Sequence, residues 1–507
     1  MHRGHPSQPA TAASVTRDIS AFWLIAMGVL AGVVFPLTSL LAAKQNADGI
    51  LPALMSTQKL TWYYWDQDRF LNLLPALAWP IPDVEWNLRL QVFLRAFFSF
   101  LAPLGILYFF SQSRRLLIPA VALANCIMGL SFAWPALFNL YVECNPFGTS
   151  MTLLALALFT LRRGEGRIGW LLLSVLIGTV AYATNIALLA MSLPLIGLSW
   201  VTGTLPRKQA FTFLLINIAS IVLAYLHSKH FGSGLTPINE LAISWEAIKA
   251  GYQSVAANVS TAALLVLSVC AMAWGIYAKA PHRYAIVLLV LGSAALVGVL
   301  SCSIWPQINT YHIRYYIVFL IAIVAADSYL IVHGLLSLRK LPIPVLPVAA
   351  GLLCVEIFIG LHGFSSNYSK LVDNMWLPRS QAVAQTAHAQ HAQLIIGDYW
   401  EAWPAAFEAN ALFPQWKNRY AQTYGASWRA AILSARIQRI AGQHGIRALC
   451  MKNDLAFCQS MTTMAMHVQA TIVPGTVQDI TVAGVPMLLM NVTLASFDSL
   501  RTTPTTH

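Results

Sequence analysis

Charged side chains are scarce in this chain. They make up only 10% of its 507 residues, whereas an ordinary soluble domain carries about 25%. Hydrophobic residues account for 57%, and the mean hydropathy is +0.63. This composition excludes an ordinary soluble enzyme and predicts a polytopic α-helical membrane protein. Because a charge at membrane depth costs roughly 2.5–3.5 kcal/mol or more, functional residues are expected in the few polar clusters.

Several familiar motifs are also absent from the sequence. There is no CxxC pair, no His/Cys spacing typical of zinc, no P-loop, no GxGxxG and no internal repeat. The net charge of +12 comes without a nucleic-acid-binding motif, so no nucleic-acid partner is expected. Of the seven cysteines, Cys450 and Cys458 lie in a segment that we expect to be exported. A disulfide is permitted there, and the sequence leaves open whether it forms.

Hydrophobic runs of about 20 residues predict about eleven transmembrane helices. The first is too long for a removable signal peptide, and the two that meet at Asn185 could instead form one kinked segment. We expect a cytoplasmic tail (1–19), a transmembrane domain (20–361) with an exported first loop (44–90), and an exported domain (362–507). The predicted spans are 20–43, 92–111, 116–134, 147–161, 168–184, 186–201, 210–226, 257–277, 284–304, 315–335 and 343–361.

Lysine and arginine residues gather at alternate ends of these spans, which marks one face as cytoplasmic. With an odd number of spans, the amino terminus is cytoplasmic and the carboxy-terminal domain is exported. The sequence therefore predicts a multi-pass protein of the cytoplasmic (inner) membrane. The basic residues in question are Arg3, Arg17, Arg114, Arg115, Arg162, Arg163, Arg167, Arg207, Lys208, Lys279, Arg283, Arg339 and Lys340.

The tail alternates between helical and strand patterns, which is typical of an α/β domain. Helices are expected at 381–391 and 427–443. Strands are expected at 394–397, 446–451, 468–473 and 485–492.

The densest polar cluster is the stretch Trp62-Tyr63-Tyr64-Trp65-Asp66-Gln67-Asp68-Arg69-Phe70 in the first exported loop. Asp66 and Asp68 could share a divalent cation such as Mg or Mn, or one of them could take a proton from an acceptor hydroxyl. Arg69 could pair with a phosphate. The alternative is an Asp-rich turn bordered by aromatic residues at the membrane interface.

Two further clusters are expected on the exported face. In the last short loop, Arg314 interrupts an apolar run and could hold a lipid phosphate with His312 beside it, or it could be an interfacial anchor. After the first strand of the tail, aromatic and acidic residues could bind a sugar or acceptor, or pack as a core tryptophan pair. These residues are Asp398, Tyr399, Trp400, Glu401 and Trp403, and Asn139 and Glu143 could complete the cavity.

The stretch Asp66-Gln67-Asp68-Arg69-Phe70, the alternating spans and the exported carboxy-terminal domain together resemble the C-type membrane glycosyltransferases (GT-C). The resemblance is to the protein O-mannosyltransferase and lipid A aminoarabinose transferase group, whose first-loop motif is Asp-Glu-x-Arg-Tyr/Phe. Gln67 stands where the motif has Glu. Family members usually have the acid close to the first span, so Asp48 is a second candidate for the catalytic residue.

The resemblance implies a GT-C-like fold and transfer of a sugar from a polyprenyl-phosphate donor to a glycan, lipid or protein acceptor. Asp66 and Asp68 would be catalytic, and Arg69, Arg314 and His312 would bind the donor phosphate. Three alternatives remain: a transporter or flippase of lipid-linked sugars, a polysaccharide polymerase or ligase, and a non-catalytic assembly subunit. A flippase would need polar residues lining several spans, yet the clearest mid-span charge is Asp327, two turns from His333.

Overall fold

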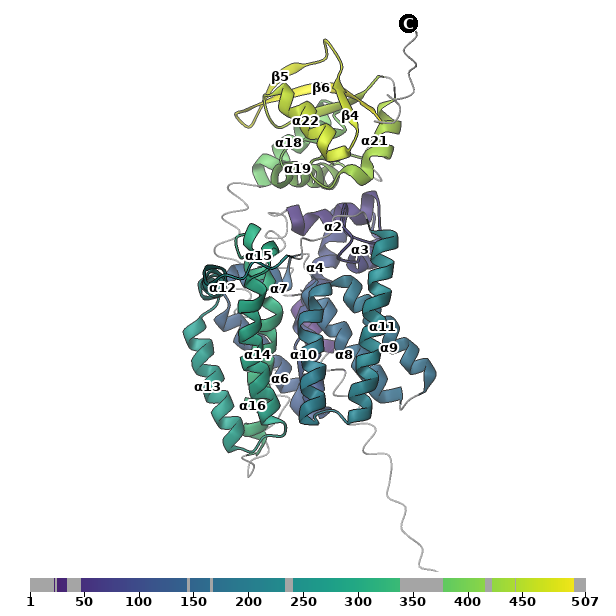
Figure 1. The fold of residues 1–507 in the computed structure, drawn as a ribbon. Helices are drawn as coiled ribbons and strands as arrows, with labels where there is room; N and C mark the ends of the chain where they lie inside the picture. Colours follow the sequence, from purple (N-terminus) through teal and green to yellow (C-terminus); the bar gives the residue numbers. More distant parts are fainter. Residues whose placement is uncertain are drawn as a thin grey trace, which may run out of the picture.

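The computed structural model describes residues 22, 25–33, 47–143, 146–164, 167–232, 240–337, 377–414, 422–442 and 444–496. The expected spans 20–43, for the most part, and 343–361 lie outside these residues. Within them, a helical body carries a C-terminal domain with a β-sheet at one end (Figure 1).

Helices make up nearly all of the body, and each of the nine expected spans on described residues coincides with a helix. Their apolar sequences bury some faces against neighbouring helices and leave others exposed. The helices are α2 (Ala47–Gln58), α3 (Leu73–Ala78), α4 (Val84–Leu101), α5 (Leu104–Phe110), α6 (Arg114–Ser131), α7 (Trp134–Tyr141), α8 (Phe147–Gly164), α9 (Ile168–Thr184), α10 (Leu189–Thr202), α11 (Arg207–Phe231), α12 (Trp245–Asn258), α13 (Thr261–Tyr277), α14 (Arg283–Ser301), α15 (Ile304–Ile308) and α16 (Ile317–Ser337), with 3-10 turns η1 (Ile186–Leu188) and η2 (Ile313–Tyr315).

Four helical segments of the described chain are long and apolar enough to cross a membrane, or up to five if a bent pair counts as one span. They are Val84–Phe110, Arg207–Phe231, Arg283–Ser301 and Ile317–Ser337. The bent pair joins Ile168–Thr184 to Ile186–Thr202 at 111°, so the two segments that meet at Asn185 do not form one straight helix. The Asn185 side chain caps the second segment by accepting a hydrogen bond from Ala187 N.

The segment expected as the first exported loop contains helices α2 and α3 and the start of α4. We call residues 47–83 the first inter-helix segment. Helix α2 is almost wholly buried, with Ile50, Leu51 and Leu54 at 0% exposure. It packs against α4 of the body and against α19 (Tyr399–Leu412) of the C-terminal domain. An apolar helix therefore joins the two parts of the molecule.

The C-terminal domain (377–496) is an α/β domain built on a mixed sheet. Its strands are β1 (Leu394–Ile396), β2 (Tyr424–Ala426), β3 (Ile446–Cys450), β4 (Gln469–Ile472), β5 (Gln478–Val482) and β6 (Val485–Ala495). The order is β2-β1-β3-β6-β4, with β1 parallel to both neighbours and β6 antiparallel to β3, β4 and β5. Alternate residues point to opposite faces, so Ile395 and Leu449 face one apolar cluster while Leu394 and Ile396 face another.

The helices of this domain are α18 (Leu377–Ala389), α19, α21 (Ser434–Ala441) and α22 (Leu455–Met466), with a 3-10 turn η4 at Ala431–Leu433. The expected helix 381–391 is present, but the expected helix 427–443 forms only as η4 and α21. Ser427–Ala430 instead makes a turn in which Ala430 N donates to Ser427 O. Helices α19 and α22 and strands β2 and β5 were not predicted.

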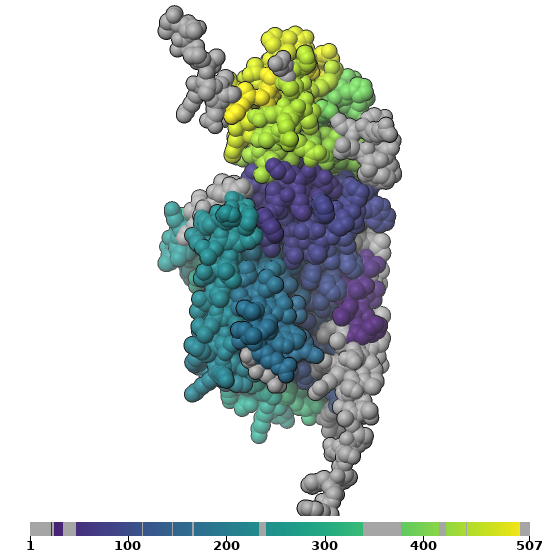
Figure 2. Space-filling view, turned by 90° about the vertical axis from the view of Figure 1, so that its right-hand side faces the viewer, coloured from purple at the N-terminus to yellow at the C-terminus, as the bar shows by residue number. Residues whose placement is uncertain are grey.

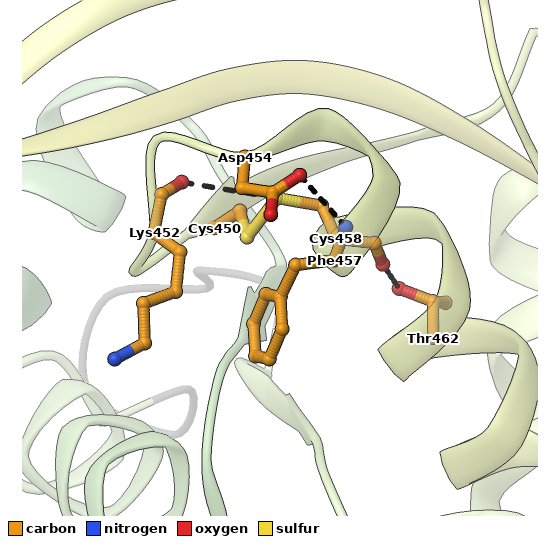
Figure 3. The surroundings of a disulfide bond; sticks show 6 residues. All are labelled: Cys450, Lys452, Asp454, Phe457, Cys458 and Thr462. Atoms are coloured by element: carbon orange, nitrogen blue, oxygen red, sulfur yellow. Dashed lines mark hydrogen bonds between the residues drawn. A yellow bond between two sulfur atoms is a disulfide. The ribbon is translucent and has the colours of Figure 1, made fainter.

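The structure contains the Cys450–Cys458 disulfide that the sequence left open. It joins the end of β3 to α22 (Figure 3). Asp454 caps α22 by accepting from Phe457 N, and Lys452 O lies within the loop that the bond closes. The disulfide thus fixes the turn that presents the Lys452 side chain to α19.

The C-terminal domain sits directly on the first inter-helix segment, and the two surfaces meet without a visible gap in the space-filling view (Figure 2). Polar contacts cross this junction at its edge. Lys59 Nζ donates to Ile432 O at 2.8 Å, and Arg436 donates to Gln58 O at 2.7 Å. At its centre, the buried rings of Trp65 and Trp403 pack at 5.8 Å. The C-terminal domain and the first inter-helix segment therefore pack directly against each other.

Candidate functional site

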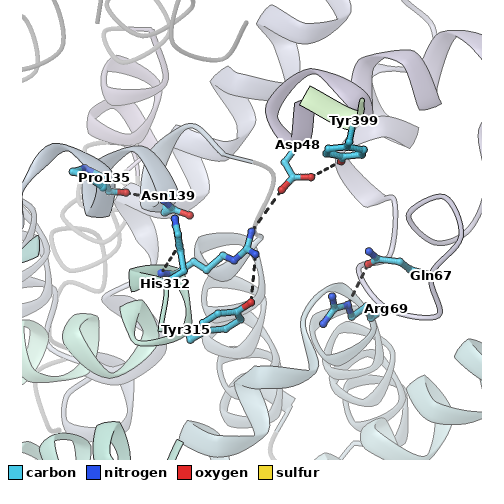
Figure 4. A network of polar contacts seen from close by, with 9 residues as sticks. Asp48, Gln67, Arg69, Pro135, Asn139, His312, Tyr315 and Tyr399 are labelled. Carbon is cyan, nitrogen blue, oxygen red and sulfur yellow. Dashed lines mark hydrogen bonds and ion pairs between the residues drawn. The ribbon is translucent and has the colours of Figure 1, made fainter. Parts of the chain in front are cut away.

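Asp48 is the residue on which three separate parts of the chain converge (Figure 4). It lies in the first turn of α2, where the helix dipole stabilises a carboxylate. Its Oδ2 is 3.6 Å from Arg314 Nη1, and its Oδ1 accepts a hydrogen bond of 2.5 Å from the Tyr399 hydroxyl. Asp48, the second candidate for the catalytic residue, is therefore held between the last short loop and the C-terminal domain.

Arg314 lies on η2, between α15 and α16, and is about a quarter exposed. Its Nη2 donates to the Tyr315 hydroxyl at 3.3 Å. Burial alone lowers the pKa of Arg314, but Tyr315, Glu143 and Asp48 outweigh that effect and raise the pKa above its usual value. The guanidinium is thus firmly charged and partly accessible, as an anion-binding group must be.

His312 caps η2, because its Nδ1 accepts a hydrogen bond of 3.4 Å from the backbone N–H of Arg314. This contact places the imidazole proton on Nε2, which is then a donor. Although part of the side chain is exposed, burial of the ring and the charge of Arg314 lower its pKa to about 4. His312 is therefore neutral at pH 7 and positions Arg314 without adding charge.

Arg69 is surrounded by aromatic rings and an uncharged amide. Its guanidinium lies 4.7 Å from the centre of the Trp305 ring and 5.1 Å from that of Phe70, and its Nε donates to the uncharged Gln67 Oε1 at 3.2 Å. Among the described residues, no carboxylate lies within ion-pair distance of it. Burial, followed by the charges of Arg429 and Arg314, lowers the pKa of Arg69. A bound anion would stabilise the charged form of Arg69 against burial and against the neighbouring cations.

Arg429 is the site residue that sequence reasoning missed. It follows β2 in the C-terminal domain, and its guanidinium lies 4.9 Å from the centre of the Tyr64 ring and 5.6 Å from that of Tyr399. Burial lowers its pKa, but Tyr399, Tyr64 and Asp48 more than offset this and raise it. Nothing in the sequence separates this arginine from Arg436 or Arg439 nearby. We call Arg69, Arg314 and Arg429 the arginine cluster.

Tyr399 is the first residue of α19, so its position depends on the C-terminal domain. Burial and the neighbouring Asp48 raise its pKa well above the ordinary value. The hydroxyl therefore stays protonated and donates a hydrogen bond to Asp48.

Asp66 and Asp68, the predicted catalytic pair, lie in different surroundings. Asp66, at φ +55°, faces the C-terminal domain: burial raises its pKa, while a backbone hydrogen bond from Ala431 and the charges of His467 and Arg429 act in the opposite direction. Asp68 lies beside the C-terminal end of α11, and its backbone carbonyl accepts a hydrogen bond of 2.5 Å from Ser228 Oγ of that helix. Within the described residues, no group of three or more His, Cys, Asp or Glu side chains could hold a metal ion. A cation at Asp66 and Asp68 stays a prediction.

The third predicted cluster forms the start of a helix, because Asp398 is the N-cap of α19 and the residues after it are helical. Its acidic members form ion pairs: Lys452 is 3.3 Å from Asp398, and Arg379 is 3.0 Å from Glu401. Trp403 has no exposed surface and its Nε1–H donates to Trp428 O, which favours the core-packing alternative for this residue. Trp400 is 46% exposed and remains open to a ligand.

Asn139 and Glu143 lie in and just after α7, which packs against η2. Asn139 donates to Pro135 O at 2.7 Å beside His312 (Figure 4), and Glu143 contributes to the electrostatics of Arg314. Asp327 and His333 do not pair with each other: Asp327 accepts from Ser268 Oγ at 2.5 Å, and His333 contacts Ser337.

Comparison with known proteins identifies the fold. No protein-family model and no curated protein sequence matches the chain. The crystal structure of ArnT from Cupriavidus metallidurans bound to undecaprenyl phosphate matches it with a TM-score of 0.52 at 11% sequence identity. The match covers 92% of this chain and 98% of that one. ArnT is a lipid A aminoarabinose transferase, of the group that this sequence resembles. The chain is thus an integral membrane protein with the GT-C fold of ArnT.

Proposed function

We propose that this protein is a membrane glycosyltransferase that moves a sugar from a polyprenyl-phosphate donor to an acceptor on the exported face of the cytoplasmic membrane. The observation that carries the proposal is the convergence of Asp48, Arg314 and Tyr399 from three distant parts of the chain. The shared fold supports it, because the matched ArnT structure contains undecaprenyl phosphate.

The residues divide the chemistry between them. Arg314 and Arg69 bind the donor phosphate, and Asp48 accepts the proton of the acceptor hydroxyl as that oxygen bonds to the anomeric carbon. The bond between the anomeric carbon and the phosphate oxygen breaks, and the polyprenyl phosphate leaves with the bonding electrons. The guanidinium groups stabilise the negative charge that develops on the leaving phosphate. Tyr399 and Arg314 hold the two oxygens of Asp48 in place.

We assign the proton acceptor to Asp48 in preference to Asp66 or Asp68, because Asp48 is ion-paired to a phosphate-binding candidate. Asp66 instead faces the C-terminal domain through Ala431. A chelator tests whether transfer needs a divalent cation at Asp66 and Asp68. A chelator should leave the transfer rate unchanged if Asp48 and the arginines suffice.

The proposal is tested by binding. Purified protein in nanodiscs should bind a polyprenyl phosphate at least tenfold more tightly than the matching polyprenol, because only the phosphate can pair with the arginines. Equal affinity for the two lipids would contradict it. A flippase would instead move labelled lipid across the liposome membrane without releasing polyprenyl phosphate from its sugar. Lipid movement and polyprenyl-phosphate release should therefore be measured on one preparation.

A further inference from the structure

The C-terminal domain contributes a cation to the site beyond Arg69 and Arg314. Arg429 reaches the first inter-helix segment across the domain junction, and its Nη1 lies 3.5 Å from Trp65 O. Its guanidinium lies over the rings of Tyr64 and Tyr399, and Tyr399 in turn donates to Asp48. One hydrogen-bonded tyrosine therefore separates Arg429 from the carboxylate that pairs with Arg314.

We propose that Arg429 binds the phosphate of the polyprenyl lipid together with Arg69 and Arg314, so that the anion site is complete only when the C-terminal domain is docked. This inference rests on the proposed function. It adds a phosphate-binding residue from a part of the chain that the sequence assigned to sugar or acceptor binding alone.

The charge of the cluster fits a phosphate group. In the described part of the chain, Asp48 is the carboxylate within ion-pair distance of Arg314, and none lies that close to Arg69 or Arg429. The charge of Arg429 also destabilises the protonated form of Arg69, so the two guanidinium groups act on each other electrostatically. Two mutually repelling cations beside aromatic rings are stabilised by an anion with several acceptor oxygens, and a phosphate monoester provides three of them.

The backbone around the arginine cluster is strained in a way that agrees with a binding role. Arg429 has φ +79°, in the left-handed region that side chains other than glycine rarely adopt. Asp66, Phe70, Thr310 and Tyr311, in the other two segments that reach the site, also have positive φ. Such conformations persist only where the surroundings fix them, and they concentrate at functional sites. At Arg429, the preceding carbonyl of Trp428 is held by Trp403 Nε1 at 3.1 Å.

Arg436 provides a matched control. It lies in the same domain, crosses the same junction to donate to Gln58 O, and stacks over Tyr424 at 5.7 Å. It differs in its electrostatic partners: Asp48 raises the pKa of Arg429, and Arg429 lowers that of Arg69, whereas Arg436 acts on Tyr424. A variant that merely loosens the junction should therefore behave alike at the two positions, whereas loss of a phosphate ligand should be specific to Arg429.

The test uses full-length protein in nanodiscs with undecaprenyl phosphate as the probe and undecaprenol as the neutral control. We expect Arg429→Gln to bind undecaprenyl phosphate roughly 10- to 100-fold more weakly and Arg436→Gln to stay within about threefold of wild type. Arg429→Lys should lie between, because it keeps the charge without the planar fork. Binding of undecaprenol should be unchanged in all three.

Each other outcome overturns the inference. Equal losses in Arg429→Gln and Arg436→Gln would mean that Arg429 acts only through docking. Wild-type binding by Arg429→Gln, with loss in Arg314→Ala, would remove Arg429 from the site and leave the proposed function standing. If wild-type protein does not prefer undecaprenyl phosphate over undecaprenol, the proposed function fails and the inference fails with it.

Discussion

Replacing Arg314 separates a phosphate ligand from an interfacial anchor. A lysine keeps a positive charge and a long stem, which is all that an anchor needs, but it loses the planar fork that can hold two phosphate oxygens. An alanine loses both. The position is informative because the guanidinium is about a quarter exposed and already paired with Asp48 and Tyr315.

The expected magnitudes follow from the number of charge-assisted hydrogen bonds lost. At about 1.5–3 kcal/mol each, the loss of one bond in Arg314→Lys should weaken binding of a polyprenyl phosphate roughly tenfold or more. The loss of two in Arg314→Ala should weaken it by roughly 100-fold or more. Titration of purified protein in nanodiscs measures both values.

The control for this series is Arg89, which pairs with Glu85 at 2.7 Å on α4 and is 39% exposed. Arg89→Ala removes an arginine ion pair of the same kind outside the arginine cluster, and it should leave binding within about threefold of wild type. If Arg314→Lys binds as wild type does, and Arg314→Ala fails only because it does not insert or fold, the reasoning is refuted and Arg314 is an anchor.

Three further predictions concern the cap, the disulfide and the topology. His312→Asn should keep polyprenyl-phosphate binding within about threefold of wild type between pH 6 and 8, because His312 is neutral there and an asparagine oxygen can replace Nδ1 as the acceptor for Arg314 N–H. His312→Ala should bind more weakly. Equal losses in the two variants would assign the ring a direct role. Removing the disulfide by Cys450→Ala with Cys458→Ala should destabilise the C-terminal domain by about 2.5 kcal/mol in denaturant unfolding of oxidised protein, and a reductant should then have no further effect, whereas unchanged unfolding would contradict the bond. A reporter fused after the last residue should be active only on the exported side, and a cytoplasmic signal would show that the predicted orientation is wrong.

Periodicity was enough to predict the nine described spans of the body and four strands of the C-terminal domain, but not the shorter helices α2, α3, α7, α12 and α15, which lie mostly in segments expected as exported loops. Strands β1, β3 and β6 lie in largely apolar runs and β4 alternates polar with apolar residues, and both patterns can be recognised in the sequence. Strand β2 was missed because its three residues include Gly425 and Ala426, whereas the equally short β1 is wholly Leu and Ile. Helix α19 was missed because Pro404 in its sixth position reads as a helix breaker. These failures are local, since burial against the sheet and α2 overrides weak local preference in both elements.

The candidate site was only partly within reach of the sequence. The sequence singled out Arg314, Arg69, His312 and Tyr399 as polar or aromatic residues in expected exported segments, and the structure places all four around Asp48 or its arginines. Their convergence could not be predicted, because Asp48 and Tyr399 are 351 positions apart. Only the docking of the C-terminal domain brings them together, and no local pattern encodes it.

The transfer reaction of Asp48→Asn tests the central claim most directly. Membranes from the native cell envelope, supplied with a radiolabelled polyprenyl-phosphate sugar, report transfer as label in the acceptor fraction and as released polyprenyl phosphate. The account predicts that Asp48→Asn lowers this rate by about 10²–10⁴-fold while binding polyprenyl phosphate no more weakly than wild type, because the amide keeps the shape and removes the proton acceptor. Wild-type transfer by Asp48→Asn, with loss in Asp66→Asn or Asp68→Asn, would move the proton acceptor to that pair, and wild-type transfer by all three variants would contradict the account.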